Sequence, residues 1–305
     1  MSNGFVNSTI DHVIKMNDKE IRVWETLSKE GSPKRNKIIL ISSGFTRRMD
    51  HFSGLAEYLS SNGFRVVRYD SLDHVGLSTG DIDEFTMTVG KQSLLAVVRW
   101  LNDKNIYDIG LIAASLAARI AYEIISEVRL SFLITAVGVV NLRDTLKRAL
   151  GLDYLNFPIG ELPDDLEFEG HRLGAKAFVH DCYAHRWQDF SSTVQNVRGL
   201  CAPFITFIAS NDSWVKQEEV FEMLSNISSD YKVYSFFGAS HNLGGNFVVL
   251  RSFYQSITKA AIALEKGSLN LDADIYEPKF EQITVTTVNE RRMRAQIENQ
   301  SLAVS

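Results

Sequence analysis

The chain has 305 residues, of which 45% are hydrophobic and 23% are charged, a composition typical of a globular protein that can bury a large core. Its formal net charge of -5 and the lack of a run of Lys and Arg argue against nucleic acid as a partner. No apolar run reaches the length of a membrane span, and residues 1–15 lack the pattern of a signal peptide, so we expect a cytoplasmic protein without a membrane span. The cysteines, Cys182 and Cys201, are expected to be small core residues outside any disulfide or metal site.

The first half of the chain alternates between predicted strands and helices. Residues 8–28 contain two alternating stretches around Asn17-Asp18, which predicts an antiparallel hairpin. A buried strand, an amphipathic helix and a second buried strand are then predicted over 37–45, 50–63 and 64–70. This βαβ pattern repeats, with helices over 90–105 and 116–128 and strands over 109–114 and 131–140. Because the strands lack polar alternation, we expect a mostly parallel sheet covered by helices on both faces.

The pattern breaks over residues 141–199, which we interpret as a helical cap insertion. It resumes with strands over 203–210 and 232–240 and helices over 216–227 and 246–267. Residues 267–305 are a polar extension that ends in a short helix or in frayed chain. The predicted organisation is therefore a core of residues 1–140 and 200–266, a cap of residues 141–199 and a C-terminal extension of residues 267–305.

Three chemically active residues each follow a predicted strand. They are Ser115, Asp212 and His241, and this order along the chain matches the triad of an α/β-hydrolase. A serine hydroxyl is a poor nucleophile at neutral pH, so His241 would take its proton while Asp212 orients the imidazole. We therefore predict an α/β-hydrolase fold, with a mostly parallel central sheet flanked by helices and with a helical cap insertion.

Two backbone N–H groups are predicted to form the oxyanion hole. In this fold one belongs to the residue after the nucleophile and the other to the loop after an earlier strand, which points to Leu116 and Phe45. Gly44 precedes Phe45 and suits a close backbone approach. The usual glycines beside the nucleophile are replaced by Ala113 and Ala117, the next smallest residues.

Each triad residue also has a structural interpretation. Ser115 would serve well as the N-cap of the following helix. Asp212 would suit a turn, and the cap carboxylates Asp181 and Asp189 fit the triad order less well. His241 would be a hydrogen-bonded loop histidine. The nucleophile interpretation is favoured because all three residues occur together and in order.

Other candidate residues carry weaker signals. Arg47, Arg48 and Asp50, beside the oxyanion loop, either meet an acidic carrier or phosphate or form a solvated ion pair. The run HDCYAHRW contains His180, Cys182 and His185, but its helical spacing does not gather three metal ligands. The apolar cap residues either line an acyl pocket or form the core of the cap; they are Leu146, Leu150, Leu152, Tyr154, Leu155 and Phe157.

Seven long sequence blocks go beyond this general pattern. They are GFTRRMDHFSGLAEYLS, FRVVRYDSLDHVGLS, DEFTMTVGK, LIAASLAAR, SFLITAVGVVNLRDTL, NDSWVKQEEV and TVNERR. Together they resemble the acyltransferase family of bacterial bioluminescence, whose members are myristoyl-acyl-carrier-protein-specific thioesterases. The resemblance covers nearly the whole chain, and it implies that small residues other than glycine around the serine are usual in that family.

The resemblance implies a cytoplasmic enzyme that moves a fatty acyl group, preferentially myristoyl, from acyl carrier protein onto its serine and then to water or another acceptor. By motif position the nucleophile is Ser115, the acid Asp212 and the base His241. The released acid would feed the fatty acid reductase that makes luciferase aldehyde, so subunits of that reductase are implied partners beside acyl carrier protein. No cofactor is implied, because the thioester is already activated.

Two other functions remain open from the residues alone. Fold and triad do not select a substrate, so a carboxylesterase or lactonase of the same fold is one alternative. The absent GxSxG motif leaves a non-catalytic binding protein of hydrolase fold as the other.

Overall fold

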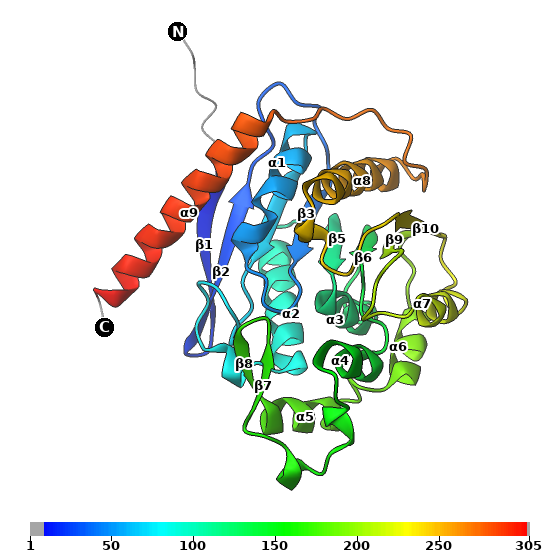
Figure 1. Ribbon diagram of the computed structural model, residues 1–305. Coiled ribbons are helices and arrows are strands. Elements are labelled where there is room, and N and C mark those ends of the chain that lie inside the picture. Colours follow the sequence, from blue (N-terminus) through cyan, green and yellow to red (C-terminus); the bar gives the residue numbers. More distant parts are fainter. Residues whose placement is uncertain (1–8, 304–305) are drawn as a thin grey trace.

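The computed structural model describes residues 9–303, so residues 1–8 of the predicted core and 304–305 of the predicted extension lie outside it. Its central sheet has eight strands (Figure 1). Two antiparallel pairs, β1·β2 and β2·β4, form one edge, and all other neighbours are parallel. The predicted N-terminal hairpin and mostly parallel sheet are therefore confirmed. In spatial order the strands are β1 (Thr9–Met16), β2 (Lys19–Thr26), β4 (Arg65–Tyr69), β3 (Ile38–Ser42), β5 (Ile109–Ala114), β6 (Phe132–Ala136), β9 (Phe204–Ala209) and β10 (Tyr231–Phe236).

Strand β3 shows why the sequences of the central strands are unbroken apolar runs. Successive side chains of a strand point to opposite faces, and here Ile38 and Leu40 join one hydrophobic cluster while Ile39 and Ile41 join the other. Both faces are thus buried beneath helices. The covering helices are α2 (Met87–Asp103), α3 (Leu116–Ile124) and α7 (Gln217–Leu224) on the first face, and α1 (Ser53–Ser61) and α8 (Phe247–Glu265) on the second.

Residues 141–199, the predicted cap, lie between β6 and β9. They form α4 (Leu142–Leu150), α5 (Ala175–Ala184), α6 (Phe190–Val197), the 3-10 helices η3 (Tyr154–Asn156) and η4 (Ile159–Glu161), and an unpredicted hairpin, β7 (Asp165–Phe168) with β8 (His171–Gly174). Glu169 and Gly170 at its turn have φ values of 49° and 78°, as a tight two-residue turn requires. The helix α6 packs against α3 and α7, so it extends the helical layer of the core.

The C-terminal extension forms a long helix, α9 (Phe280–Leu302), where a short helix or frayed chain was predicted. The helix lies across α1 (Figure 1). Its Glu290 accepts from Nη2 of Arg68 at 2.8 Å, and the two side chains are only 4% and 1% exposed. Arg68 also donates to the carbonyl of Met49 and the hydroxyl of Thr26. A buried ion pair therefore fastens the extension to the core.

Replacing Glu290 with alanine is expected to lower the free energy of unfolding by about 3–5 kcal/mol, because the buried guanidinium of Arg68 loses its counter-charge. Urea unfolding measured by circular dichroism gives this value. The matched control is Glu298→Ala on the same helix, whose partner Arg294 and own side chain are 13% and 46% exposed. Its expected loss is at most about 1 kcal/mol, and equal losses in the two variants would contradict this role for Glu290.

None of the described helices combines the length and apolar character needed to cross a lipid bilayer. Cys182 is buried as predicted, but Cys201 is exposed. The prediction was wrong for Cys201 because this residue lies in the loop between α6 and β9, outside both packed elements.

Candidate active site

Ser115 occupies a strained turn between β5, which ends at Ala114, and α3, which begins at Leu116. Its φ and ψ are 53° and -122°, a conformation that costs a non-glycine residue about 1–3 kcal/mol. Backbone hydrogen bonds hold the turn: the N–H of Ser115 donates to Ala136 at 3.0 Å, and its carbonyl accepts from Val139 at 3.1 Å. The Ser115 side chain does not cap α3. Ser115 thus stands at the N-cap position of α3 without the capping hydrogen bond, and its hydroxyl faces the cavity.

Small residues let neighbouring backbone approach this turn. A Cβ on Gly44 would lie 3.0 Å from both the Ala114 carbonyl oxygen and the Ser115 Cβ, so glycine at this position avoids a tight contact with the turn. Ala113 and Ala117 are 0% and 1% exposed. Their methyl groups are accommodated within the packed core, which explains how the turn forms without the usual flanking glycines.

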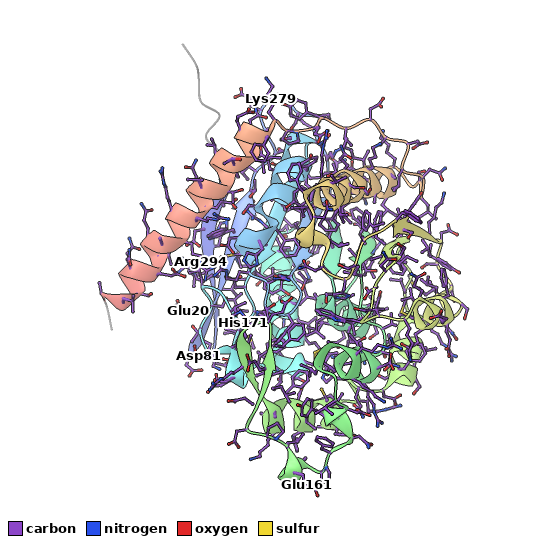
Figure 2. The ribbon with its side chains drawn as sticks, in the orientation of Figure 1. Glu20, Asp81, Glu161, His171, Lys279 and Arg294 are labelled. Carbon is purple, nitrogen blue, oxygen red and sulfur yellow. The ribbon has the colours of Figure 1, made fainter. Side chains whose placement is uncertain are left out.

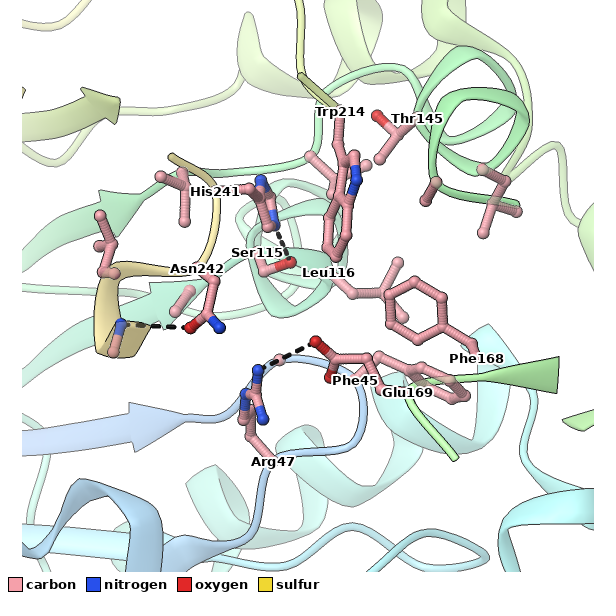
Figure 3. A pocket seen from close by; sticks show the side chains of 18 of the residues that line it. Phe45, Arg47, Ser115, Leu116, Thr145, Phe168, Glu169, Trp214, His241 and Asn242 are labelled. Atoms are coloured by element: carbon pink, nitrogen blue, oxygen red, sulfur yellow. Dashed lines mark hydrogen bonds and ion pairs between the residues drawn. The ribbon is translucent and has the colours of Figure 1, made fainter. Parts of the chain in front are cut away.

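The three predicted triad residues meet in one hydrogen-bonded chain. Ser115 Oγ lies 2.8 Å from His241 Nε2 (Figure 3), and His241 Nδ1 lies 2.8 Å from Asp212 Oδ2. Because an ionised carboxylate only accepts, Nδ1 carries the imidazole proton and Nε2 accepts from the serine. The second oxygen, Asp212 Oδ1, accepts the N–H groups of Trp214 and Val215 at 2.9 and 3.0 Å. The carboxylate is thus held in a fixed orientation.

The backbone of the predicted oxyanion hole is also in place. Phe45 and Leu116 line the same cavity as Ser115, and within residues 9–303 neither N–H donates a hydrogen bond to another group. Two free donors beside a nucleophile can stabilise a developing oxyanion. Both predicted residues are therefore available for that role.

The loop that carries Phe45 is held by its neighbour Thr46, whose φ is 62°. The N–H of Thr46 donates to His74 Nε2 at 3.2 Å, and its hydroxyl donates to Glu169 of the cap at 2.6 Å. Burial lowers the pKa of His74 to about 4, so this imidazole is neutral at physiological pH and able to accept. His74 and Glu169 were not identified from the sequence, because only the fold brings them to this loop.

Ser115 opens into a mostly apolar cavity of about 460 Å³, within the range of small-molecule sites. Of the six apolar cap residues considered above, Leu146 and Leu150 line it, and the other four do not. Three buried residues of the hairpin and α5 complete the apolar wall, and sequence reasoning missed all of them: Leu166, Leu173 and Phe178.

Aromatic side chains close the cavity near the triad. The ring of Trp214 packs on His241 with centroids 4.6 Å apart, and Phe168 packs on Trp214 at 5.3 Å and on Phe45 at 5.9 Å. Figure 3 shows these rings beside the serine. They shield the Ser115–His241 hydrogen bond from water, which strengthens electrostatic interactions in the site.

The remaining candidates have structural partners. Arg47 pairs with Glu169 at 3.2 Å, and Arg48 pairs with Asp50 at 3.2 Å. The cap carboxylates Asp181 and Asp189 accept backbone N–H groups of Thr88 and Ser191 rather than meeting His241.

The run HDCYAHRW does not gather ligands. Cys182 is buried on α5, while His180 is exposed on the same helix and His185 is exposed directly after its end. Within the part of the chain that the structure describes, no cluster of three or more His, Cys, Asp or Glu could hold a metal ion.

Comparison with known sequences gives consistent full-length matches. A family model described as acyl transferase matches residues 8–299. A relative from Photorhabdus luminescens, called acyl transferase, is 61% identical, and the alignment covers 100% of both chains. Relatives of the same name from Vibrio campbellii and Aliivibrio fischeri are each 62% identical and cover 96% and 97% of this chain, and 97% of their own length.

Comparison with solved structures finds α/β-hydrolases. Est1E from Butyrivibrio proteoclasticus, bound to ferulic acid, aligns with a TM-score of 0.67 and 18% identity over 83% of this chain and 99% of its own. The Pyrococcus furiosus esterase Pf2001 aligns with a TM-score of 0.61 and 20% identity over 87% and 94%. Similarity at this level shows the fold alone, and the predicted α/β-hydrolase fold is confirmed.

Proposed function

The chain belongs to the acyl transferase family and is an acyl-transferring enzyme, and on that premise we propose that it is a serine thioesterase that releases long-chain fatty acids, preferentially myristate, from acyl-carrier-protein thioesters. The observation that carries the proposal is the Ser115–His241–Asp212 chain at an apolar cavity. Family membership rules out the non-catalytic binding protein considered above.

The first half of the proposed reaction forms an acyl-serine. His241 Nε2 takes the proton of Ser115 as Oγ attacks the thioester carbonyl carbon. The carbonyl oxygen becomes an oxyanion beside the N–H groups of Phe45 and Leu116. When the C–S bond breaks, the sulfur leaves with the electron pair and receives the proton from His241. Asp212 stays ionised and stabilises the imidazolium throughout.

The second half reverses these roles. A water molecule, or another acceptor hydroxyl, gives its proton to His241 Nε2 and attacks the acyl-serine carbonyl carbon. The second oxyanion collapses by breaking the bond to Oγ, and His241 returns the proton to Ser115. The products are the free acid, or an ester of the acceptor, and the regenerated serine. No cofactor takes part, because the thioester already supplies an activated acyl group.

We propose that acyl carrier protein delivers the acyl chain in the cytoplasm, and that the released acid supplies a fatty acid reductase that makes luciferase aldehyde. Subunits of that reductase would then be further partners. The support for this assignment is the resemblance of the long sequence blocks to the bioluminescence acyltransferase family. A carboxylesterase or lactonase of the same fold remains the competing function.

A series of acyl thioesters from hexanoyl to octadecanoyl, each compared with the oxygen ester of equal length, tests the proposal. We expect the highest kcat/KM for the tetradecanoyl thioester and turnover lowered by about 10⁶-fold in Ser115→Ala. A consistent preference for the oxygen esters would instead establish the competing esterase function.

The cavity wall provides a second test of the acyl site. Replacing Leu146 with tryptophan adds a ring to the apolar wall and overpacks the cavity. The loss of binding free energy is expected to lower kcat/KM for tetradecanoyl thioester by about tenfold. Hexanoyl thioester, which needs less room, should be affected less. The control is Leu152→Trp, because Leu152 is 50% exposed and lies outside the cavity lining. Equal effects on both chain lengths would argue against acyl binding at Leu146.

A further inference from the structure

A second hollow of about 660 Å³ adjoins the catalytic cavity. The two share four lining residues, which are His51, Gly244, Leu250 and Tyr254. The two hollows are therefore adjacent, and these four residues form the boundary between them. We call the second hollow the arginine groove, after the three arginines that line it: Arg48, Arg291 and Arg294.

The arginine groove lies between the segment after β3 and the C-terminal helix. One wall comes from the 3-10 helix η1 (Met49–Phe52) and the start of α1, and the other from α9 between Ile283 and Glu298. Figure 2 shows Arg294 on the side of α9 that faces the core. At 1.5 Å per residue, this part of α9 is about 22 Å long. A wall of this length is long enough to lie along an extended, flexible arm.

The charges of the arginine groove favour an anion. Three guanidinium groups face two carboxylates, those of Asp50 and Glu298. Arg294 lies 3.4 Å from Asp50 and 2.7 Å from Glu298, and Arg48 also pairs with Asp50, so these two arginines share both carboxylates. Arg291 is exposed and has no hydrogen bond or ion pair to any residue from 9 to 303. One positive charge is thus left over at Arg291.

The pKa of His51, at the junction of the two hollows, is affected by the same arginines. Burial lowers its pKa, Asp50 partly offsets this, and Arg48, Arg47 and Arg294 lower the pKa further. The imidazole is therefore neutral at physiological pH, and the positive charge around it belongs to the arginines.

We propose that the arginine groove binds the polar arm of the acyl donor and that Arg291 pairs with the phosphate at the end of that arm. The inference rests on the proposed thioesterase function. An acyl thioester has an apolar acyl half and a polar half, and the acyl half fills the cavity beside α4. The polar half must leave Ser115 by another route, and a pantetheine arm ends in a phosphate whether it comes from acyl carrier protein or coenzyme A. Arginine binds phosphate through charge-assisted hydrogen bonds.

The test compares tetradecanoyl-pantetheine with tetradecanoyl-4′-phosphopantetheine, which differ by one phosphate. In Arg291→Gln we expect KM for the phosphorylated substrate to rise by about tenfold, with KM for tetradecanoyl-pantetheine and both kcat values unchanged. The matched control is Arg292→Gln, because Arg292 is also exposed on α9 but does not line the groove. The control should match the parent enzyme on both substrates.

Equal KM changes on the two substrates, or none, would overturn the role of Arg291. If the parent enzyme hydrolyses neither thioester, the proposed function fails as well; if it hydrolyses both without preference, only the arginine groove inference fails. Repeating the comparison with tetradecanoyl-coenzyme A and tetradecanoyl-acyl carrier protein identifies the source of the phosphate. The donor that loses affinity in Arg291→Gln is the one that uses the groove.

Discussion

Replacing Ser115 with alanine is expected to lower kcat for release of tetradecanoic acid by about 10⁶-fold, the cost of losing the nucleophile of a serine triad. The reason is local: Ser115 Oγ lies 2.8 Å from His241 Nε2 and faces the cavity. A steady-state assay with tetradecanoyl thioester, extended by single-turnover measurements, covers this range. The rate that remains above that of the uncatalysed reaction in water would come from the oxyanion hole and substrate binding alone.

The matched control for this variant is Ser213→Ala. Ser213 is an exposed serine next to Asp212, and its loss should leave kcat within about twofold of the parent, as expected for a surface change. Circular dichroism of both variants checks the fold. Retention of substantial turnover by a folded Ser115→Ala protein would contradict the assignment of the nucleophile.

Replacing Asp212 with asparagine is expected to lower kcat by about 10⁴-fold, as in other triads that lose the correct imidazole tautomer. Asp212 Oδ1 accepts two backbone N–H groups, from Trp214 and Val215. In asparagine only the carbonyl oxygen can replace Oδ1 there, so the NH₂ group must face His241 Nδ1. The imidazole then carries its proton on Nε2 and cannot accept from Ser115.

The control for Asp212→Asn is Asp189→Asn in the cap. Asp189 caps α6 by accepting from Ser191, and asparagine caps helices about equally well. Near-parent kcat is therefore expected for Asp189→Asn in the same assay. A loss in Asp189→Asn that matched the loss in Asp212→Asn would mean that the carboxylate beside His241 has no special role.

The turn around Ser115 could be predicted because its signals are local. An apolar strand, one serine and a helical repeat follow each other without a gap, and the structure has β5 end at Ala114 and α3 begin at Leu116. The apolar strands that precede Asp212 and His241 were equally clear from the sequence. The order of three residues after three strands was enough to bring them into one site, because parallel strands carry their C-terminal ends to the same edge of the sheet.

The cap and the extension could not be predicted to the same depth. The β7–β8 hairpin has strands of four residues around a Glu-Gly turn, too short for a clear alternating pattern. It nevertheless brings Phe168 and Glu169 to the oxyanion loop. The helix α9 has a weakly amphipathic sequence, and its position depends on the buried pair of Glu290 with Arg68, which is 222 residues away. Contacts at such separations leave no local signal.

The central claim is that a fatty acyl group passes through an ester on Ser115. The direct measurement is mass spectrometry of enzyme quenched with acid within milliseconds of mixing with tetradecanoyl thioester. The quenched enzyme is measured first intact and then after digestion into peptides. We predict an increase in mass equal to one tetradecanoyl group, mapped to the peptide that contains Ser115 and absent from Ser115→Ala. Rapid turnover with no adduct, or an adduct on another residue, would contradict the account.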